Sequence, residues 1–238
     1  VIGARVLLRG VRPGSYPRGG SVHLRLWTAN RLADASGATN LSGAPWMVDY
    51  ARALGARVGH DVDLHTLPPV TGMLTLGDGC SIEPEVDLTG YWIDGDVVHI
   101  GHVEVGPGAT VGARSTLLPG AKVGKNAEVT AGSAVAGKVK ANQQWSGSPA
   151  GKVGKATRPW PSSRPPRSRA WVPVYGVTSL LLSGLPLFAI AVGLLVVGWA
   201  AAGARTLAGA IGRGALVLAP ATLLSLGVFA LITLVAVR

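Results

Sequence analysis

A six-residue hydrophobic period runs through the middle of the chain. Steps of six from Val58 reach an aliphatic residue every time up to Leu88, and steps of six from Val105 do so up to Val135. Small residues follow four positions after the aliphatic residues of the second run, at Ala109, Ser115, Ala121, Ala127 and Ser133. Six residues form one short side and one turn of a triangular coil, so the period predicts a parallel β-helix of 18 residues per coil over residues 58–140.

The period is broken once. The step of six fails at Asp94, resumes at Ile100, and starts in a new register at Val105. This break predicts an irregular loop between two regular stacks of coils. Departures from an otherwise consistent pattern tend to mark functional sites, so we expect function near this loop.

Two long uncharged segments follow the repeat, at residues 170–204 and 215–237. About 20 apolar residues span a bilayer, so each segment predicts a transmembrane helix, the first irregular near Gly184 and Pro186. The expected loop between them carries Arg205 and Arg213. Six Lys and Arg residues precede the first helix, and the positive-inside rule places that side in the cytoplasm. The chain is therefore expected in the cell membrane as a multi-pass protein with a cytoplasmic β-helix.

The segments flanking the repeat complete the expected domain organisation. Residues 1–20 are interpreted as the end of a preceding membrane helix with its juxtamembrane loop, and residues 21–57 as amphipathic helices. The first of these helices lies on the membrane or packs on the β-helix, and the second begins at Pro45 and ends at Gly55. The β-helix domain covers residues 58–155, a Pro- and Arg-rich linker 156–171, and two transmembrane helices 172–238. We expect the chain to be a piece of a larger membrane protein.

Composition and charge narrow the function classes. The chain is 48% hydrophobic and only 14% charged, which excludes a disordered protein. The net charge of +10 suggests a nucleic-acid partner at first, but residues 34–128 hold all twelve acids against five bases. The folded body is thus acidic and its flanks are basic, so we expect a lipid bilayer as partner and no nucleic acid. The single Cys80 excludes an internal disulfide and is expected to be buried packing.

Histidines of the repeat are the candidate general bases. In an 18-residue coil, residues 18 apart stack, so His65 lies beside Glu83. A carboxylate beside an imidazole orients the ring and raises its basicity, which suits proton removal from an attacking amine. His102, next to the break, is the other candidate. The alternative for each histidine is an exposed turn residue without a catalytic role.

Carboxylates gather around the break and are the candidate substrate-binding residues. Glu85, Asp87, Asp94 and Asp96 can attract a cationic amine substrate, or they form an acidic solvated surface. His60, Asp78 and Asp96 would stack as a column only if the turn near Asp94 keeps the register. We predict no metal site from so weak a signal.

Two segments carry a resemblance to a known family. IGHVEVGPGATVGARSTLLPGAKVGKNAEVTAGSAV and AGSAVAGKVKANQQWSGSPAGKVGK resemble the repeat core and the closing loop of hexapeptide-repeat acyltransferases, over about residues 55–155. The resemblance implies a mainly β fold, a left-handed parallel β-helix, with acyltransferase activity. It also implies the three-fold association of β-helices usual there, either as a homo-oligomer or as a pseudo-trimer within one chain.

A narrower resemblance uses nearly the whole chain. The segment PWMVDYARALGARVGHDVDLHTLPPVTGMLTLGDGCSIEPEVDLTGYWIDGD, followed by coils and membrane helices, is similar to the C-terminal part of poly-lysine-synthetase-like nonribosomal peptide synthetases. The resemblance implies amide-bond formation between an aminoacyl thioester on phosphopantetheine and a cationic amine. It implies as partners the adenylation and carrier domains of the same larger protein.

The resemblance also suggests where the thioester arm lies. In acyl-CoA transferases the closing loop runs along the pantetheine, which here implies Trp145, Gly147, Pro149 and Ala150, with Lys138 near the phosphate. Simple closure of the helix end by Trp145 explains the same loop. Two further functions stay open: a stand-alone membrane-tethered acyltransferase that uses acyl-CoA, and a non-catalytic β-helix scaffold.

Overall fold

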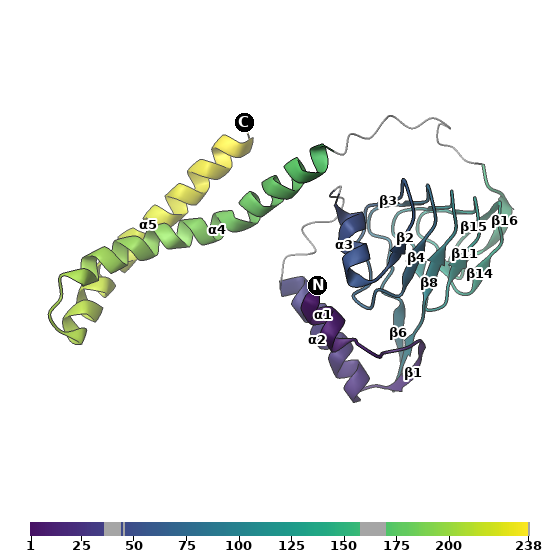
Figure 1. Ribbon diagram of the computed structural model, residues 1–238, viewed down its shortest axis with the longest axis horizontal. Helices are drawn as coiled ribbons and strands as arrows, with labels where there is room; N and C mark the ends of the chain where they lie inside the picture. The colour runs from purple at the N-terminus through teal and green to yellow at the C-terminus, as the bar shows by residue number, and fades with distance from the viewer. Residues whose placement is uncertain (36–43, 45, 158–169, 238) are drawn as a thin grey trace. The chain divides into compact units, whose positions relative to one another are not determined.

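A computed structural model describes residues 1–35, 44, 46–157 and 170–237 of the 238-residue chain (Figure 1). Contacts within the chain divide it into two compact units, Val1–Tyr175 and Gly176–Arg238, and each is described here by itself. Most of the predicted linker, at residues 158–169, lies outside the described residues.

The first unit begins with three helices and one strand: α1 (Ile2–Leu7), β1 (Gly14–Pro17), α2 (Ser21–Ala35) and α3 (Met47–Leu54). Helix α3 ends where predicted, because Gly55 adopts the left-handed conformation with φ of 108° that terminates many helices. It begins at Met47, and the predicted start at Pro45 lies outside the described residues. Helix α2 buries Leu26 and Ala29, so it packs on the rest of the unit.

Short parallel strands then form the predicted β-helix, which confirms the fold expected from the six-residue period. One sheet has five strands, in the order β14, β11, β8, β4, β2, and a second has six, in the order β16, β15, β12, β9, β5, β3. The bounds of the strands before the break are β2 (Arg57–Val58), β3 (Asp63–Leu64), β4 (Leu74–Leu76) and β5 (Ser81–Ile82). Those of the coils after it are β8 (Val103–Val105), β9 (Thr110–Val111), β10 (Thr116–Leu117), β11 (Lys122–Val123), β12 (Glu128–Val129) and β13 (Ala134–Val135).

The strand register reproduces the 18-residue coil. Arg57 pairs with Thr75 in one sheet, and Asp63 pairs with Ser81 in another. The aliphatic residues of the period point into the helix, where Ile82, Val111 and Leu117 are almost fully buried. The small residues fill the corners and are buried too, as is Cys80, whose predicted packing role is thereby confirmed. Burial of each large aliphatic side chain stabilises the fold by about 1.5–3 kcal/mol.

Close backbone contact between coils explains several glycines. A Cβ built at Gly112 would lie 2.5 Å from the amide nitrogen of Ala131 on the next coil. Real Cβ atoms do not approach a backbone atom so closely, so the stack requires glycine at this corner.

The predicted irregular loop is a β-hairpin. Strands β6 (Tyr91–Asp94) and β7 (Val97–Ile100) pair antiparallel, and β1 from the N-terminal segment pairs with β7 to give a three-stranded sheet. The hairpin lengthens its coil, since Ser81 pairs with Thr110, 29 residues later. Ile100, where the period resumes in the sequence, therefore belongs to β7 and packs with Leu26 and Val98 rather than in the β-helix core.

The last coil is shorter and is closed by an antiparallel strand. Strand β14 (Lys138–Val139) pairs with β11 at a spacing of 16 residues. Strand β15 (Gln143–Ser146) continues the six-stranded sheet, and β16 (Gly151–Lys155) folds back on it antiparallel. Trp145 packs against the β-helix core at this end.

The second unit contains two long apolar helices, α4 (Trp171–Ala202) and α5 (Leu207–Val237). Both are long and apolar enough to cross a membrane, and little of either is buried within the protein. They contact each other near Ala189 and Ala221, which are buried. Two expectations need correction: α4 continues through Gly184 and Pro186, and Arg213 lies within α5 rather than in the loop. The loop is short because glycine- and alanine-rich residues before position 215 extend the helix by two turns.

Candidate functional site

A groove of about 410 Å³ lies where the hairpin leaves the β-helix. We call it the hairpin groove. It is bounded by the start of β1, the end of β7, and the outer face of two coils; its lining residues are Pro13, Gly14, Ser15, His99, Ile100, Gly101, His102, Glu104, Pro119, Gly120 and Lys122. The predicted candidate His102 lies in this groove, beside a second histidine.

His102 is held by a hydroxyl of the preceding coil. Its Nε2 atom lies 2.8 Å from Oγ1 of Thr75, and the side chain is partly buried. The fixed register places the two residues together, because β4 pairs with β8 and Thr75 is opposite Glu104. This bond leaves Nδ1 as the ring nitrogen that is not engaged by Thr75.

His99 is a candidate that the sequence analysis missed. Its Nδ1 atom lies 2.9 Å from Oγ of Ser15 on β1, which leaves Nε2 for a substrate. Val98 and Ile100 are buried, so the intervening His99 points from the opposite face of β7. That alternation was readable in the sequence, but the approach of Ser15 was not, because β1 and β7 are more than 80 residues apart.

Charged residues extend the hairpin groove along the outer face of the five-stranded sheet. Lys122 and Glu104 form an ion pair of 2.9 Å. Lys138 is the register partner of Lys122 on the next coil. The predicted phosphate-binding Lys138 therefore belongs to the same column of outward residues as the groove. Trp145, Gly147, Pro149 and Ala150 lie on or next to β15, in a different sheet, so the structure does not gather all five predicted cofactor-binding residues at one surface.

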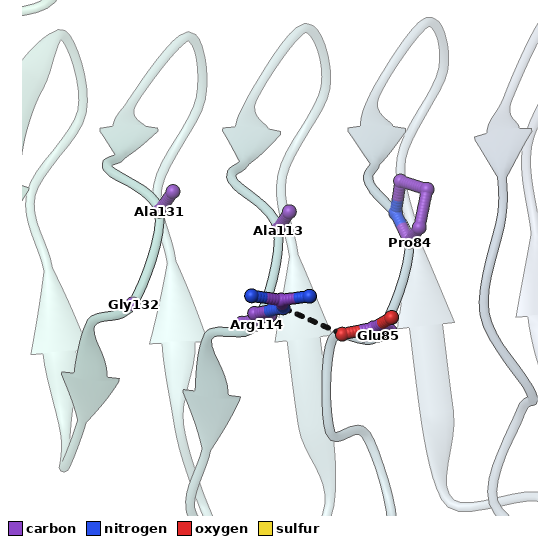
Figure 2. A pocket seen from close by; sticks show the side chains of 6 residues that line it. All are labelled: Pro84, Glu85, Ala113, Arg114, Ala131 and Gly132. Atoms are coloured by element: carbon purple, nitrogen blue, oxygen red, sulfur yellow. Dashed lines mark hydrogen bonds and ion pairs between the residues drawn. The ribbon is translucent and has the colours of Figure 1, made fainter.

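A second groove, of about 550 Å³, runs across a corner of the β-helix and is called the corner groove (Figure 2). It is lined by two rows of residues from three successive coils: Pro84, Ala113 and Ala131, and Glu85, Arg114 and Gly132. Figure 2 shows Glu85 and Arg114 reaching toward each other, with Nε and Oε2 2.6 Å apart. The hydrogen bond to Glu85 raises the pKa of the exposed Arg114 guanidinium.

The other predicted base lies near the corner groove. His65 follows β3 and Glu83 follows β5, and the register of these strands stacks the two residues on successive coils, as expected. The Glu83 carboxylate accepts the backbone N–H of Ala113 at 2.9 Å. His65 is exposed and donates its backbone N–H to Ile82. His65 and His102 thus lie at corners that adjoin different sheets, and the structure does not bring them together.

The predicted acidic cluster is divided between two places. Glu85 pairs with Arg114 in the corner groove, and Asp87 accepts the backbone N–H of Thr89. Asp94 and Asp96 lie at the tip of the hairpin, where both are exposed. Burial, and then the negative charge of Asp87, raise the pKa of Tyr91 at the base of the hairpin.

The conditional column of His60, Asp78 and Asp96 does not form. Asp78 accepts the backbone N–H of His60 at 2.7 Å, but the hairpin shifts the register beyond it. Gly108, rather than Asp96, follows Asp78 on the next coil and donates its N–H to the Asp78 carbonyl. Among the described residues, no three His, Cys, Asp or Glu side chains meet in a way that could hold a metal ion.

Comparison with known proteins gives one curated relative. No family model matches the chain. A delta-poly-L-ornithine synthetase of Acinetobacter baumannii is 29% identical over 203 residues, which cover 82% of this chain and 15% of that protein. The resemblance to poly-amino-acid synthetases noted from the sequence is thereby confirmed. The chain spans only a small part of the length of this relative.

Solved structures with a similar arrangement include acetyltransferases. A maltose O-acetyltransferase from Clostridium difficile is 17% identical with a TM-score of 0.46, covering 64% of this chain and 96% of that one. A serine acetyltransferase from Neisseria gonorrhoeae is 24% identical with a TM-score of 0.40, covering 65% and 52%. A serine acetyltransferase from Brucella abortus in complex with coenzyme A is 20% identical with a TM-score of 0.38, covering 65% and 54%.

Proposed function

We propose that this chain is the acyltransferase-like, amide-forming unit of a larger membrane-anchored poly-amino-acid synthetase. The observation that carries the proposal is the hairpin groove, in which two histidines are each oriented by a hydroxyl group. An imidazole near its neutral form, fixed in a groove, suits removal of a proton from an amine. The similarity to a poly-ornithine synthetase supports the same class of reaction.

The reaction proposed is aminolysis of a thioester. The nitrogen of the acceptor amine attacks the carbonyl carbon, and a C–N bond forms while the C–S bond breaks. His102 or His99 takes the proton that the amine loses, and returns a proton to the sulfur of the leaving thiol. Each histidine has one ring nitrogen on a hydroxyl partner and the other left for this transfer.

The acyl donor proposed is an aminoacyl group on the phosphopantetheine of a carrier domain. Lys138 lies one coil beyond Lys122 in the column that ends at Thr75 and His102. A donor laid along this column would place its phosphate near the Lys138 ammonium and its thioester in the hairpin groove. Acyl-CoA has the same pantetheine arm, so a stand-alone acyl-CoA-dependent acyltransferase is the second candidate.

The acceptor proposed is a cationic amine that approaches along the hairpin. Cross-strand pairing puts Ser15, His99 and Trp92 on one face of the three-stranded sheet, with Asp94 two residues from Trp92 on that face. Trp92 is 53% exposed, and an exposed indole beside a carboxylate suits an ammonium group. Arg18 donates to the Gly95 carbonyl rather than to Asp94 or Asp96. The hairpin tip therefore keeps a net negative charge.

The membrane arrangement proposed follows from α4 and α5. Lys152 and Lys155 stand before the first helix, whereas the short loop between the helices contains only Arg205. This asymmetry favours a cytoplasmic β-helix unit and a return of α5 to the cytoplasm. A β-helix that associates three-fold, between chains or within the larger protein, is part of the proposal.

The test uses the full-length synthetase, purified in detergent, with His99→Ala and His102→Ala variants. Amide product is measured by mass spectrometry with carrier-bound aminoacyl thioester and, separately, with the matching aminoacyl-CoA. The proposal predicts product from the carrier-bound donor and a loss of about 10²–10⁴-fold in rate for the variant that lacks the base.

The outcomes separate the candidate functions. Faster turnover with acyl-CoA than with the carrier-bound donor favours the stand-alone acyltransferase. Unchanged product formation in both single variants and in the double variant, with circular dichroism unaltered, supports a non-catalytic scaffold and contradicts the proposed site.

A further inference from the structure

Exposed apolar side chains of the first unit concentrate at its N-terminal helices. Nine large hydrophobic residues between Val1 and Lys155 are exposed among those the structure describes. Six of the nine belong to α1, to α2 or to the residue before α1: Val1, Ile2, Val6, Leu24, Trp27 and Leu32. Scattered single hydrophobics on a surface are ordinary, but such a concentration marks an interaction surface. We call it the helical surface.

Helix α2 has two faces of different use. Leu26 and Ala29 are buried on the face that packs on the unit. Leu24 and Trp27, three residues apart, are 62% and 54% exposed, and Arg31 follows Trp27 after one turn. The sequence left open whether this helix packs on the β-helix unit or lies on a membrane. The structure shows a packed face and leaves a second apolar face without a described partner.

Helix α1 extends the helical surface and is fixed to α2. Ile2 and Val6 are 81% and 68% exposed and share one face, because they are four residues apart. The guanidinium of Arg25 on α2 donates to the carbonyl of Leu7 and to that of Arg9, the latter at 2.6 Å. These bonds satisfy carbonyls at the end of α1, so the two helices form one element.

The charge around the helical surface has one sign. Residues 1–33 contain six arginines and no carboxylate. Arg31 pairs with Asp34 at 3.4 Å, whereas the side chains of Arg9 and Arg12 form no ion pair with any described residue. Apolar side chains flanked by arginine are the composition of helices that lie in the interface of an anionic bilayer.

We infer that the helical surface lies on the anionic lipid surface of the membrane, with Trp27 and Ile2 among the acyl chains and arginines at the phosphates. Tryptophan is favoured at the level of lipid headgroups, and arginine reaches from there to the water. The occupant is a lipid surface rather than a protein because of the unbalanced positive charge and because the same chain carries two helices that can cross a membrane. The inference does not depend on the proposed reaction.

The experiment measures depth in the bilayer by spin labelling. The full chain is reconstituted into vesicles of phosphatidylcholine with or without phosphatidylglycerol, after Cys80→Ala removes the single cysteine. Trp27→Cys carries the label, and Trp92→Cys is the matched control, because these tryptophans are 54% and 53% exposed. Collisions with oxygen report lipid, and collisions with a water-soluble nickel chelate report water. The apolar helices keep both variants in the vesicles, so binding itself is not the readout.

The expected result is a lipid-like ratio of collisions at position 27 in phosphatidylglycerol vesicles and a water-like ratio at position 92. The double variant Arg9→Glu and Arg12→Glu should shift position 27 at least several-fold toward the water-like ratio. A water-like ratio at position 27 in both kinds of vesicle overturns the inference. Protection from both reagents in both kinds of vesicle also overturns it, since a second copy or another protein then covers the surface.

Discussion

The β-helix contains a regular part and an interrupted part, and the two differ in what holds them together. From Val103 to Ser146 the coils repeat with nearly constant register, and each coil contacts only its neighbours. From Leu74 to His102 one coil is lengthened by the hairpin, and a strand from residues 14–17 joins it. The regular part depends on local repetition, and the interrupted part depends on contacts between distant segments.

The difference assigns separate tasks to the two parts. Regular coils bury aliphatic residues and small corner residues, and their outer faces change little from coil to coil. The hairpin groove, with His99 and His102, exists only because the repeat is interrupted. Stability and the candidate chemistry are therefore expected to respond to different substitutions, which can be measured.

The largest expected effect on stability compares two isoleucines. Ile82 is fully buried in the regular core, whereas Ile93 on the hairpin is 37% exposed. Replacement of Ile82 by alanine should lower the free energy of unfolding by about 2–5 kcal/mol. Ile93→Ala should cost about 0.5 kcal/mol or less. Chemical denaturation followed by circular dichroism measures both, and equal costs would contradict the division into a core and an added hairpin.

A smaller effect is expected from glycines of the coil corners. Gly112→Ala puts a Cβ 2.5 Å from the next coil and should destabilise the unit by about 1–3 kcal/mol. Gly151→Ala is the control, because no atom lies within 4 Å of its built Cβ. The midpoints of urea unfolding decide the matter, and a neutral Gly112→Ala would show that the coils can separate without cost.

The smallest effect concerns the positioning of His99 by Ser15. Loss of an accessible hydrogen bond is worth about 0.5–1.5 kcal/mol, so Ser15→Ala should slow amide formation by roughly 2- to 13-fold. Because Ser15 fixes the ring rather than touching the reacting atoms, the pH profile of the rate should shift as well, and Ser15→Thr should restore it. A reduced rate with an unchanged pH profile would indicate a merely structural role.

The regular part was predictable from the sequence, and the interrupted part was predictable only in position. The six-residue period places Val111, Leu117 and Val129 in the core because every coil repeats the same local environment. The break at Asp94 located the hairpin. Its 11 extra residues of register, which separate Asp96 from Asp78, depend on antiparallel pairing that a period cannot encode.

The candidate site was partly predictable for the same reason. His102 was found because it adjoins the break, and the stacking of His65 beside Glu83 followed from the 18-residue coil. The role of His99 depends on Ser15, and a contact between β1 and β7 leaves no periodic signal in the sequence. The early start of α5 was missed because Arg213 looks like a loop residue, although a single arginine is tolerated near a helix end.

The central claim is that the chemistry belongs to the interrupted coil rather than to a regular corner. The most direct measurement compares His102→Gln with His65→Gln in the full-length synthetase, with amide product quantified under saturating donor and folding checked by circular dichroism. We expect His102→Gln to lose about 10²–10⁴-fold in rate and His65→Gln to stay within about twofold of the parent. A large loss in His65→Gln with normal activity in His102→Gln would contradict the account and move the site to the corner groove.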